Sequence, residues 1–276
     1  MADICKTKWI DSLQEYPEIS CNMSDVQDVP FFTYMPAEAP PLVELRTMYG
    51  LTDLVWGMSE LAAALKLLEW TYAAIEHDGN ATNPQPCNSL NILATCMIEK
   101  KAVNCRMKAI VLNEVYLSLG YRSRYITCMP AVADGDCHVL VMVYIASLGH
   151  WITVDPTQNT YFTGPDGAII NVLQARQIYR RGGTPGLHHI ERPLIAPLIF
   201  NGVECNSYDE FYILYMSNNC FRFACPVASE FGYDSTQDAR FIYLSPLGYD
   251  PAIGVEYDRK RCFSIDDSGL LLMPPT

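Results

Sequence analysis

The sequence is poor in basic residues. It carries 19 lysines and arginines against 31 aspartates and glutamates, a formal net charge of −12 at pH 7. Nucleic-acid binding draws much of its affinity from lysine and arginine side chains that neutralise phosphates, and an anionic membrane surface attracts the same side chains. This shortage argues against nucleic acid and against a membrane as partners.

Long apolar runs are also missing. No stretch approaches the roughly 18 apolar residues of a membrane span, and the first ten residues, MADICKTKWI, lack the continuous apolar segment of a signal peptide. The eleven cysteines are odd in number and do not follow the spacing of a disulfide framework, which indicates reduced thiols. We therefore expect a cytoplasmic protein, although a chain whose signal peptide had been removed would look the same.

Metal-binding motifs are absent as well. The adjacent pair His188 and His189 invites a metal-site interpretation, but neighbouring side chains diverge and no CxxC or HExxH motif accompanies them. The sequence thus predicts neither a metal nor an organic cofactor.

What is present fits a globular chain. Of 276 residues, 50% are hydrophobic and 18% are charged, enough to bury a sizeable core. Residues 1–50 contain several prolines among aromatic and acidic residues, which predicts an irregular arm. Because no repeat or low-complexity linker follows, we expect residues 51–276 to form a single α+β domain.

Two helices are expected after this arm. In the first, over residues 51–77, apolar residues step by three and four, Thr52 or Asp53 can cap the start, and Gly57 weakens the helix only locally. The second covers residues 89–100 and is capped by Asn88 or Ser89. Both would shield from solvent the helix that follows them.

That following helix begins near Cys105. Leu112, Val115 and Leu119 lie on one face at helical spacing, and Gly120 ends the pattern. At a helix N-terminus the unpaired backbone N–H groups and the positive end of the helix dipole favour a thiolate. The same N–H groups can hold a developing oxyanion. Cys105 is therefore placed to act as a nucleophile.

Three strands follow. The first is YRSRYITC, and the next two, HVLVMVYI beginning at His138 and WITVD ending at Asp155, are joined by a short connector that contains Gly149. If the loop holds an even number of residues, His138 and Asp155 project from the same face of the hairpin. Asp134 and Asp136 are rivals to Asp155 as the partner of the histidine.

Other residues receive structural interpretations. Cys137 is expected to pack on the opposite side of the strand from its neighbour, and His77 to be solvated or structural. Further along, helices are predicted over residues 170–182 and 207–219, and Ser207 is expected to cap the second of them. The segments CFRFACPV, RFIYLSP and CFSIDDSGLLLMPP alternate like strands that could complete the sheet.

Together these motifs resemble the transglutaminase-like superfamily, which includes animal transglutaminases, peptide N-glycanase and many bacterial cysteine hydrolases. The resemblance covers a core at about residues 88–160. It implies an α+β fold with a papain-like core, in which the catalytic helix packs on an antiparallel sheet, preceded here by extra N-terminal helices.

The resemblance also implies roles. Cys105 would be the nucleophile, His138 the general base and acid, and Asp155 the residue that holds the imidazole. Two positions depart from the family's pattern: Asn104 stands where a glycine is usual, and Val139 follows the histidine in place of an Ala-Trp pair. The side chain that completes the oxyanion hole is not given by a motif, and Asn88, Asn91 and Asn104 are the candidates.

The expected reaction is hydrolysis of an amide, peptide-type bond through a thioester. The accessory β-domains and calcium-binding segments of the large animal enzymes would not fit in this chain, so we favour hydrolysis over cross-linking. Two alternatives stay open. One is an acyltransferase that accepts an amine, and the other is a non-catalytic binding module that retains the fold. The expected substrate is a peptide or a small amide.

Overall fold

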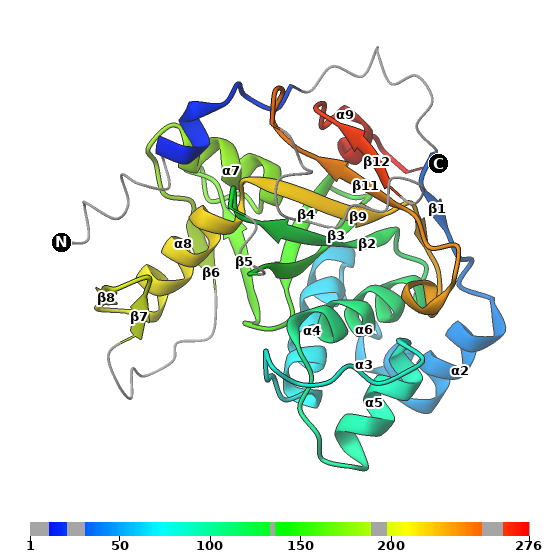
Figure 1. Ribbon diagram of the computed structural model, residues 1–276. Helices are drawn as coiled ribbons and strands as arrows, with labels where there is room; N and C mark the ends of the chain where they lie inside the picture. The colour runs from blue at the N-terminus through cyan, green and yellow to red at the C-terminus, as the bar shows by residue number, and fades with distance from the viewer. Residues whose placement is uncertain (1–10, 21–30, 133–135, 189–197, 250–261, 276) are drawn as a thin grey trace.

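The computed structural model describes residues 11–20, 31–132, 136–188, 198–249 and 262–275. An eight-stranded sheet runs through the middle of the molecule, with helices on both of its faces (Figure 1). Its strand order is β12-β11-β9-β2-β3-β4-β5-β6. Neighbouring strands are antiparallel, except that β11 and β12 run parallel. The α+β fold expected from the sequence is confirmed.

The strands of the central sheet are β2 (Ser123–Met129), β3 (His138–Ile145), β4 (His150–Asp155), β5 (Thr160–Thr163), β6 (Gly186–His188), β9 (Arg222–Pro226), β11 (Phe241–Leu244) and β12 (Cys262–Ile265). Two small sheets accompany it. One pairs β1 (Thr33–Tyr34) with β10 (Ala228–Ser229), and the other pairs β7 (Leu198–Phe200) with β8 (Val203–Cys205).

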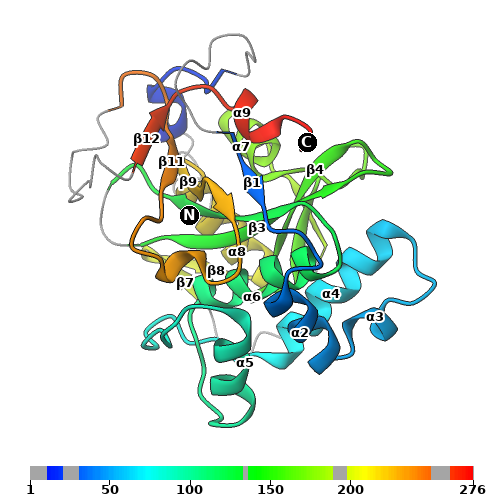
Figure 2. The ribbon, with the colours of Figure 1, turned by 90° about the vertical axis from the view of Figure 1, so that its right-hand side faces the viewer.

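The helices fall into two groups. Those on one side of the sheet are α2 (Pro40–Met48), α3 (Leu51–Leu54), α4 (Glu60–Ala74), α5 (Ser89–Met97) and α6 (Cys105–Ser118). Those on the other side are α7 (Val172–Arg180), α8 (Tyr208–Asn219) and α9 (Gly269–Leu272). Figure 2, turned by 90°, shows the same separation, with α2 to α6 together below the sheet.

Strand β3 separates two hydrophobic cores. Val139, Val141 and Val143 pack in the core that contains α4, α5 and α6, whereas Leu140 and Met142 pack in the core that contains α7, α8 and α9. Alternate side chains of a strand point to opposite faces of its sheet. A strand that is covered on both faces must be apolar at every position, which explains the continuous apolar sequence of β3.

Helix α6 begins and ends where the sequence predicts. The Asn104 side chain caps it by accepting the backbone N–H of Met107 at 3.2 Å, and Cys105 is its first residue. Every residue from Met107 to Ser118 is buried. Gly120, just beyond the helix, has a left-handed φ of 85°, as expected of a terminating glycine.

The prediction of one long helix over residues 51–77 is wrong, because a turn divides this stretch into two helices. Helix α3 ends at Leu54, Gly57 has a left-handed φ of 74°, and α4 starts at Glu60. Ser59, rather than Thr52 or Asp53, caps α4, with its hydroxyl accepting the N–H of Ala62. The continuous apolar periodicity concealed a turn that a glycine adopts without a steric cost.

The prediction of an irregular arm over residues 1–50 is wrong for its last part. Residues 40–48 form α2, in which Leu42 and Leu45 are buried and which contacts α6. Proline is well tolerated in the first turn of a helix, because the N–H that it lacks would have no intrahelical acceptor there. Pro40 therefore begins a helix instead of breaking one.

Most of the helices and strands predicted for the second half of the chain are confirmed. Helices α7 and α8 are confirmed, and Ser207 caps α8 through the N–H of Glu210. Asn88 caps α5. Strands β9, β11 and β12 complete the sheet as expected. The strands β5, β6, β7 and β8 and the short helix α9, within the last of the strand-like segments, were not predicted.

Candidate active site

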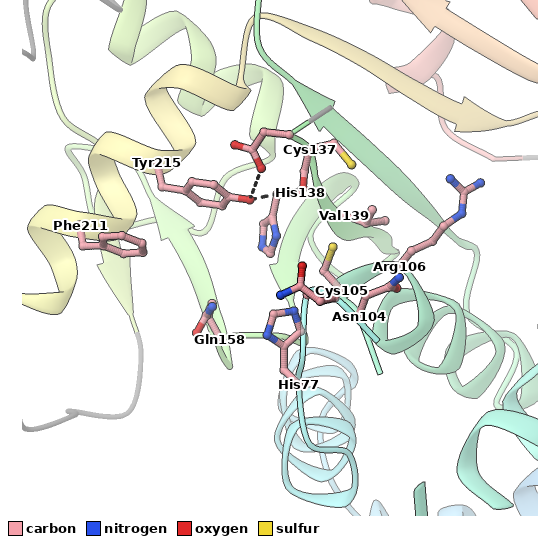
Figure 3. Close-up of a pocket in the computed structure, with 13 residues that line it drawn as sticks. His77, Asn104, Cys105, Arg106, Cys137, His138, Val139, Gln158, Phe211 and Tyr215 are labelled. Atoms are coloured by element: carbon pink, nitrogen blue, oxygen red, sulfur yellow. Dashed lines mark hydrogen bonds between the residues drawn. The ribbon is translucent and has the colours of Figure 1, made fainter. Parts of the chain in front are cut away.

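A cavity of about 560 Å³ opens where α6 and β3 both begin. Figure 3 shows Cys105 and His138 directed toward one another inside it, with Tyr215 and Phe211 of α8 along one wall. The residues that line the cavity are His77, Gly79, Asn80, Asn104, Cys105, Arg106, Asp136, Cys137, His138, Val139, Gln158, Phe211 and Tyr215.

The β3–β4 hairpin satisfies the test of loop length. Ile145 pairs with His150, which leaves the four residues 146–149 in the loop. The ladder pairs Val141 with Val154, and continuing it by one step sets Asp155 opposite Leu140, diagonal to His138. The Glu60 carboxylate holds the loop by accepting backbone N–H groups from residues 146 and 147, at 2.9 and 2.7 Å.

His138 and Asp155 meet in a direct hydrogen bond. His138 Nε2 lies 2.7 Å from Asp155 Oδ2, and the two residues are 3% and 2% exposed. Tyr212 of α8 donates its hydroxyl to the same carboxylate oxygen at 2.8 Å. The other oxygen, Oδ1, accepts the N–H groups of Thr157 at 2.7 Å and Gln158 at 3.2 Å. The carboxylate is therefore held on both oxygens.

The rival acidic residues do not take this position. Asp136 lies in the cavity wall, where its carboxylate accepts hydrogen bonds from Tyr215 and Asn219 of α8. Asp134 falls outside the described residues. Asp155 is thus the carboxylate that the fold presents to His138.

The protonation of this pair follows from its surroundings. Burial opposes the ionisation of Asp155, but the adjacent His138, the Tyr212 hydroxyl and the Thr157 N–H outweigh it, so the pKa of the carboxyl is lowered. Burial would also lower the pKa of His138, but the charge and hydrogen bond of Asp155, together with Cys105, raise it well above its ordinary value. The imidazole is accordingly protonated near neutral pH.

Cys105 is ionised in the same range. Burial opposes a thiolate, yet hydrogen bonds from His138 and His77, the charge of His138 and the backbone N–H of Val139 lower the pKa of the thiol to about 6. Because Nε2 of His138 is engaged with Asp155, Nδ1 is the nitrogen left to face the sulfur. The arrangement supports a thiolate–imidazolium pair.

The three asparagine candidates for the oxyanion hole differ in whether they line the cavity. Asn104 lines the cavity, but its Oδ1 caps α6 and its Nδ2 donates to Asn83 at 2.5 Å. Asn88 caps α5, and Asn91 donates its Nδ2 to the carbonyl of Pro86 at 3.0 Å. Neither Asn88 nor Asn91 lines the cavity, so the prediction is wrong for both: capping and turn bonds hold them at the start of α5.

Two residues that the sequence analysis set aside lie in the site. His77 is exposed, as a solvated histidine would be, but it also lines the cavity and helps to lower the pKa of Cys105. Cys137 was expected to pack away from its neighbour, yet it is exposed in the cavity wall. Burial and the charge of Cys105 raise the pKa of the Cys137 thiol. It is therefore an unactivated cysteine close to an activated one.

The eight cysteines for which the structure describes a side chain are all free thiols. In the described part of the chain, no three histidine, cysteine or acidic side chains are grouped as a metal ion would require. None of the described helices has both the length and the apolar composition needed to span a lipid bilayer.

Comparison with known proteins gives a family match and matches to solved structures. Residues 52–156 match the model of the transglutaminase-like superfamily. A solved structure of a candidate cysteine protease from Cytophaga hutchinsonii aligns at 15% identity with a TM-score of 0.33, over 69% of this chain and 64% of that protein. No curated protein matches the chain. The segment that carries Cys105, His138 and Asp155 is therefore similar to the core of the transglutaminase-like superfamily.

Proposed function

We propose that the protein is a cysteine hydrolase that cleaves an amide bond of a peptide or a small amide, with Cys105 as nucleophile, His138 as base and acid, and Asp155 as the residue that orients and charges the imidazole. The observation that carries this proposal is one continuous set of contacts. Cys105 at the start of α6 and His138 are directed toward one another in the cavity (Figure 3), and His138 Nε2 lies 2.7 Å from Asp155 Oδ2.

In the first half of the reaction, the Cys105 thiolate attacks the amide carbonyl carbon, and the carbonyl oxygen takes up the negative charge. The C–N bond then breaks. His138 gives its proton to the departing amine, which leaves an acyl thioester on Cys105 and a neutral imidazole. The first N–H groups of a helix have no intrahelical acceptor, so those at the start of α6 are available to stabilise the oxyanion.

In the second half, His138 removes a proton from a water molecule, which attacks the thioester. The C–S bond breaks, the carboxylic acid is released, and the thiolate–imidazolium pair is restored. Throughout, Asp155 holds the ring by Nε2 and stabilises its positive charge. The superfamily match to residues 52–156 supports thiol-dependent chemistry of this general kind.

Alkylation with iodoacetamide tests the nucleophile. At pH 6.5 to 7 we expect carboxamidomethylation at Cys105 alone, and its loss in the His138→Ala variant, because the pKa of Cys105 is about 6. Cys137 is a matched internal control, since it lines the same cavity but has a raised pKa. Equal labelling of the two cysteines would reject the activated thiol and leave a non-catalytic binding module.

A second measurement separates hydrolysis from transfer. p-Nitrophenyl acetate should release nitrophenol in a burst and leave an acetyl group on Cys105, detectable by mass spectrometry. Turnover in buffer alone indicates hydrolysis. Consumption of an added primary amine faster than water would instead assign the protein as an amine-accepting acyltransferase.

A further inference from the structure

The oxyanion that this mechanism forms needs more than one donor. Removing a single donor from such a hole typically costs about 10²–10³ in rate, so each donor makes a large contribution. The backbone N–H of Cys105, at the first position of α6, supplies one. Of the asparagines suggested by the sequence, Asn88 and Asn91 lie outside the cavity, and Asn104 already commits its oxygen to the cap of α6 and one of its two amide N–H groups to Asn83.

His77 is fixed at the mouth of α6 by the backbone. It forms a parallel bridge with Val103, two residues before Cys105. The N–H of Val103 donates to the carbonyl of Glu76 at 3.1 Å, and the N–H of Asp78 donates to the carbonyl of Val103 at 3.0 Å. The segment that carries His77 is thus tied to the segment that leads into the catalytic helix.

The His77 ring faces the reacting atoms. It lines the same cavity as Cys105 and is among the groups that lower the pKa of the Cys105 thiol, and Figure 3 shows its ring beside Cys105, on a segment separate from the strand that carries His138. No role in the triad falls to His77, because His138 is the imidazole bonded to Asp155. A second N–H donor therefore lies next to the nucleophile without a function in the proton transfers.

We propose that His77 is the side-chain donor of the oxyanion hole, giving a ring N–H to the carbonyl oxygen when Cys105 attacks, beside the backbone N–H of Cys105. The inference rests on the proposed function. Before attack the His77 ring lies beside the thiolate. During attack the negative charge moves from the sulfur to the adjacent oxygen, a smaller atom that accepts a stronger charge-assisted hydrogen bond. The bond therefore strengthens in the transition state, which is the condition for catalysis.

Two reagents separate this role from simple activation of the thiol. Iodoacetamide alkylates sulfur without forming an oxyanion, whereas p-nitrophenyl acetate forms one. We expect His77→Ala to slow acetylation of Cys105 by about 10²–10³, as for the loss of one donor, and to slow alkylation at saturating pH only a few-fold. His77→Gln keeps an N–H donor and should recover most of the loss. Thermal melting of each variant checks folding.

A matched control is His188→Ala. His188 is an exposed histidine whose ring stacks on Tyr161, away from the cavity, so this substitution should change neither rate. Acetylation by His77→Ala at the wild-type rate would overturn the inference alone, as would a parallel fall in acetylation and alkylation, which would limit His77 to thiol activation. Absence of acetylation in the wild-type protein would overturn the proposed function and the inference with it.

Discussion

Asp155 and Glu114 are two fully buried carboxyl groups whose pKa values move in opposite directions. Asp155 lies at the cavity, where the charge of His138 outweighs burial and lowers its pKa. Glu114 lies in the middle of α6 and accepts N–H groups from Ser89 at 2.7 Å and Gly232 at 2.9 Å. There burial dominates and raises the pKa to about 7, despite both hydrogen bonds.

The difference lies in the neighbouring charge. Backbone N–H donors stabilise both carboxylates, but Asp155 also contacts an imidazolium. The charge that acts on Glu114 is that of Asp234, which is negative and raises the pKa of Glu114 further. In this protein the buried carboxyl that contacts a cation has a lowered pKa, whereas the pKa of the one held by N–H groups alone is raised to about 7. Asp155 is accordingly suited to stabilising the charge of the imidazolium. Glu114 instead connects α6 to the start of α5 and to the loop at residue 232.

The largest expected effect comes from removing the charge of Asp155. In Asp155→Asn we expect acetylation of Cys105 by p-nitrophenyl acetate to fall by about 10³–10⁴, because an amide neither holds the required tautomer nor stabilises the imidazolium. Stopped-flow release of nitrophenol measures the rate. Asp136→Asn, in the wall of the same cavity, is the control and should lose less than ten-fold. Equal losses of rate in the two variants would contradict the role of Asp155 in orienting and charging His138.

The second effect is a shift in the pH dependence of thiol reactivity. Cys105 has a pKa of about 6, so its alkylation rate should rise through pH 6 and level off near pH 7. Without the imidazolium in His138→Ala, the midpoint should move to ~8.5 or above, the ordinary range of a cysteine. Alkylation rates between pH 5 and 10 give both midpoints. A midpoint that stays near 6 would assign the activation to the start of α6 and His77 alone.

How much of the site can be predicted from the sequence depends on how far apart along the chain the contacting residues lie. The start of α6 and the pairing of His138 with Asp155 follow from local periodicity and from the parity of a short loop, which need no knowledge of the remaining fold. Tyr212 was missed because it approaches Asp155 from a helix that lies 57 residues further on. No spacing rule connects a helix to a hairpin across that distance.

His77 illustrates the same limit. The bridge to Val103 that carries His77 to Cys105 is a single isolated pairing between two loops, without the alternating pattern that identifies a strand. The prediction of Asn88 and Asn91 as oxyanion donors was wrong for the opposite reason. Asn88 and Asn91 stand close to Cys105 in sequence, but capping α5 and bonding to Pro86 are local bonds that occupy them.

The third prediction concerns Glu114 and stability. Its folded pKa of about 7 lies above the ~4.3 of an unfolded glutamate, so the folded state binds more protons, and stability contributed by this group falls as pH rises from ~4.3 to 7. Glu114→Gln removes that dependence and turns an NH₂ group toward an N–H donor. We expect a destabilisation of ~1–3 kcal/mol that is largest near pH 5 and shrinks by pH 8.

Urea unfolding at several pH values measures this difference. Acetylation of Cys105 should stay within a few-fold of the wild-type rate, because Glu114 does not line the cavity. A loss of acetylation that matches that of Asp155→Asn, in a folded Glu114→Gln variant, would show that the two carboxyl groups are not functionally distinct.

The smallest effect is expected for Tyr212→Phe, which removes one of the neutral donors that hold Asp155 while leaving the imidazolium in place. One intramolecular hydrogen bond contributes about 1 kcal/mol, so acetylation should fall about five-fold. Tyr179→Phe is the control, since among the described residues the buried Tyr179 hydroxyl has no hydrogen-bond partner. If charge is what separates Asp155 from Glu114, Asp155→Asn must exceed Tyr212→Phe by at least ten-fold. A loss in Tyr212→Phe as large as that in Asp155→Asn would mean that the phenol, rather than the cation, keeps the carboxylate ionised.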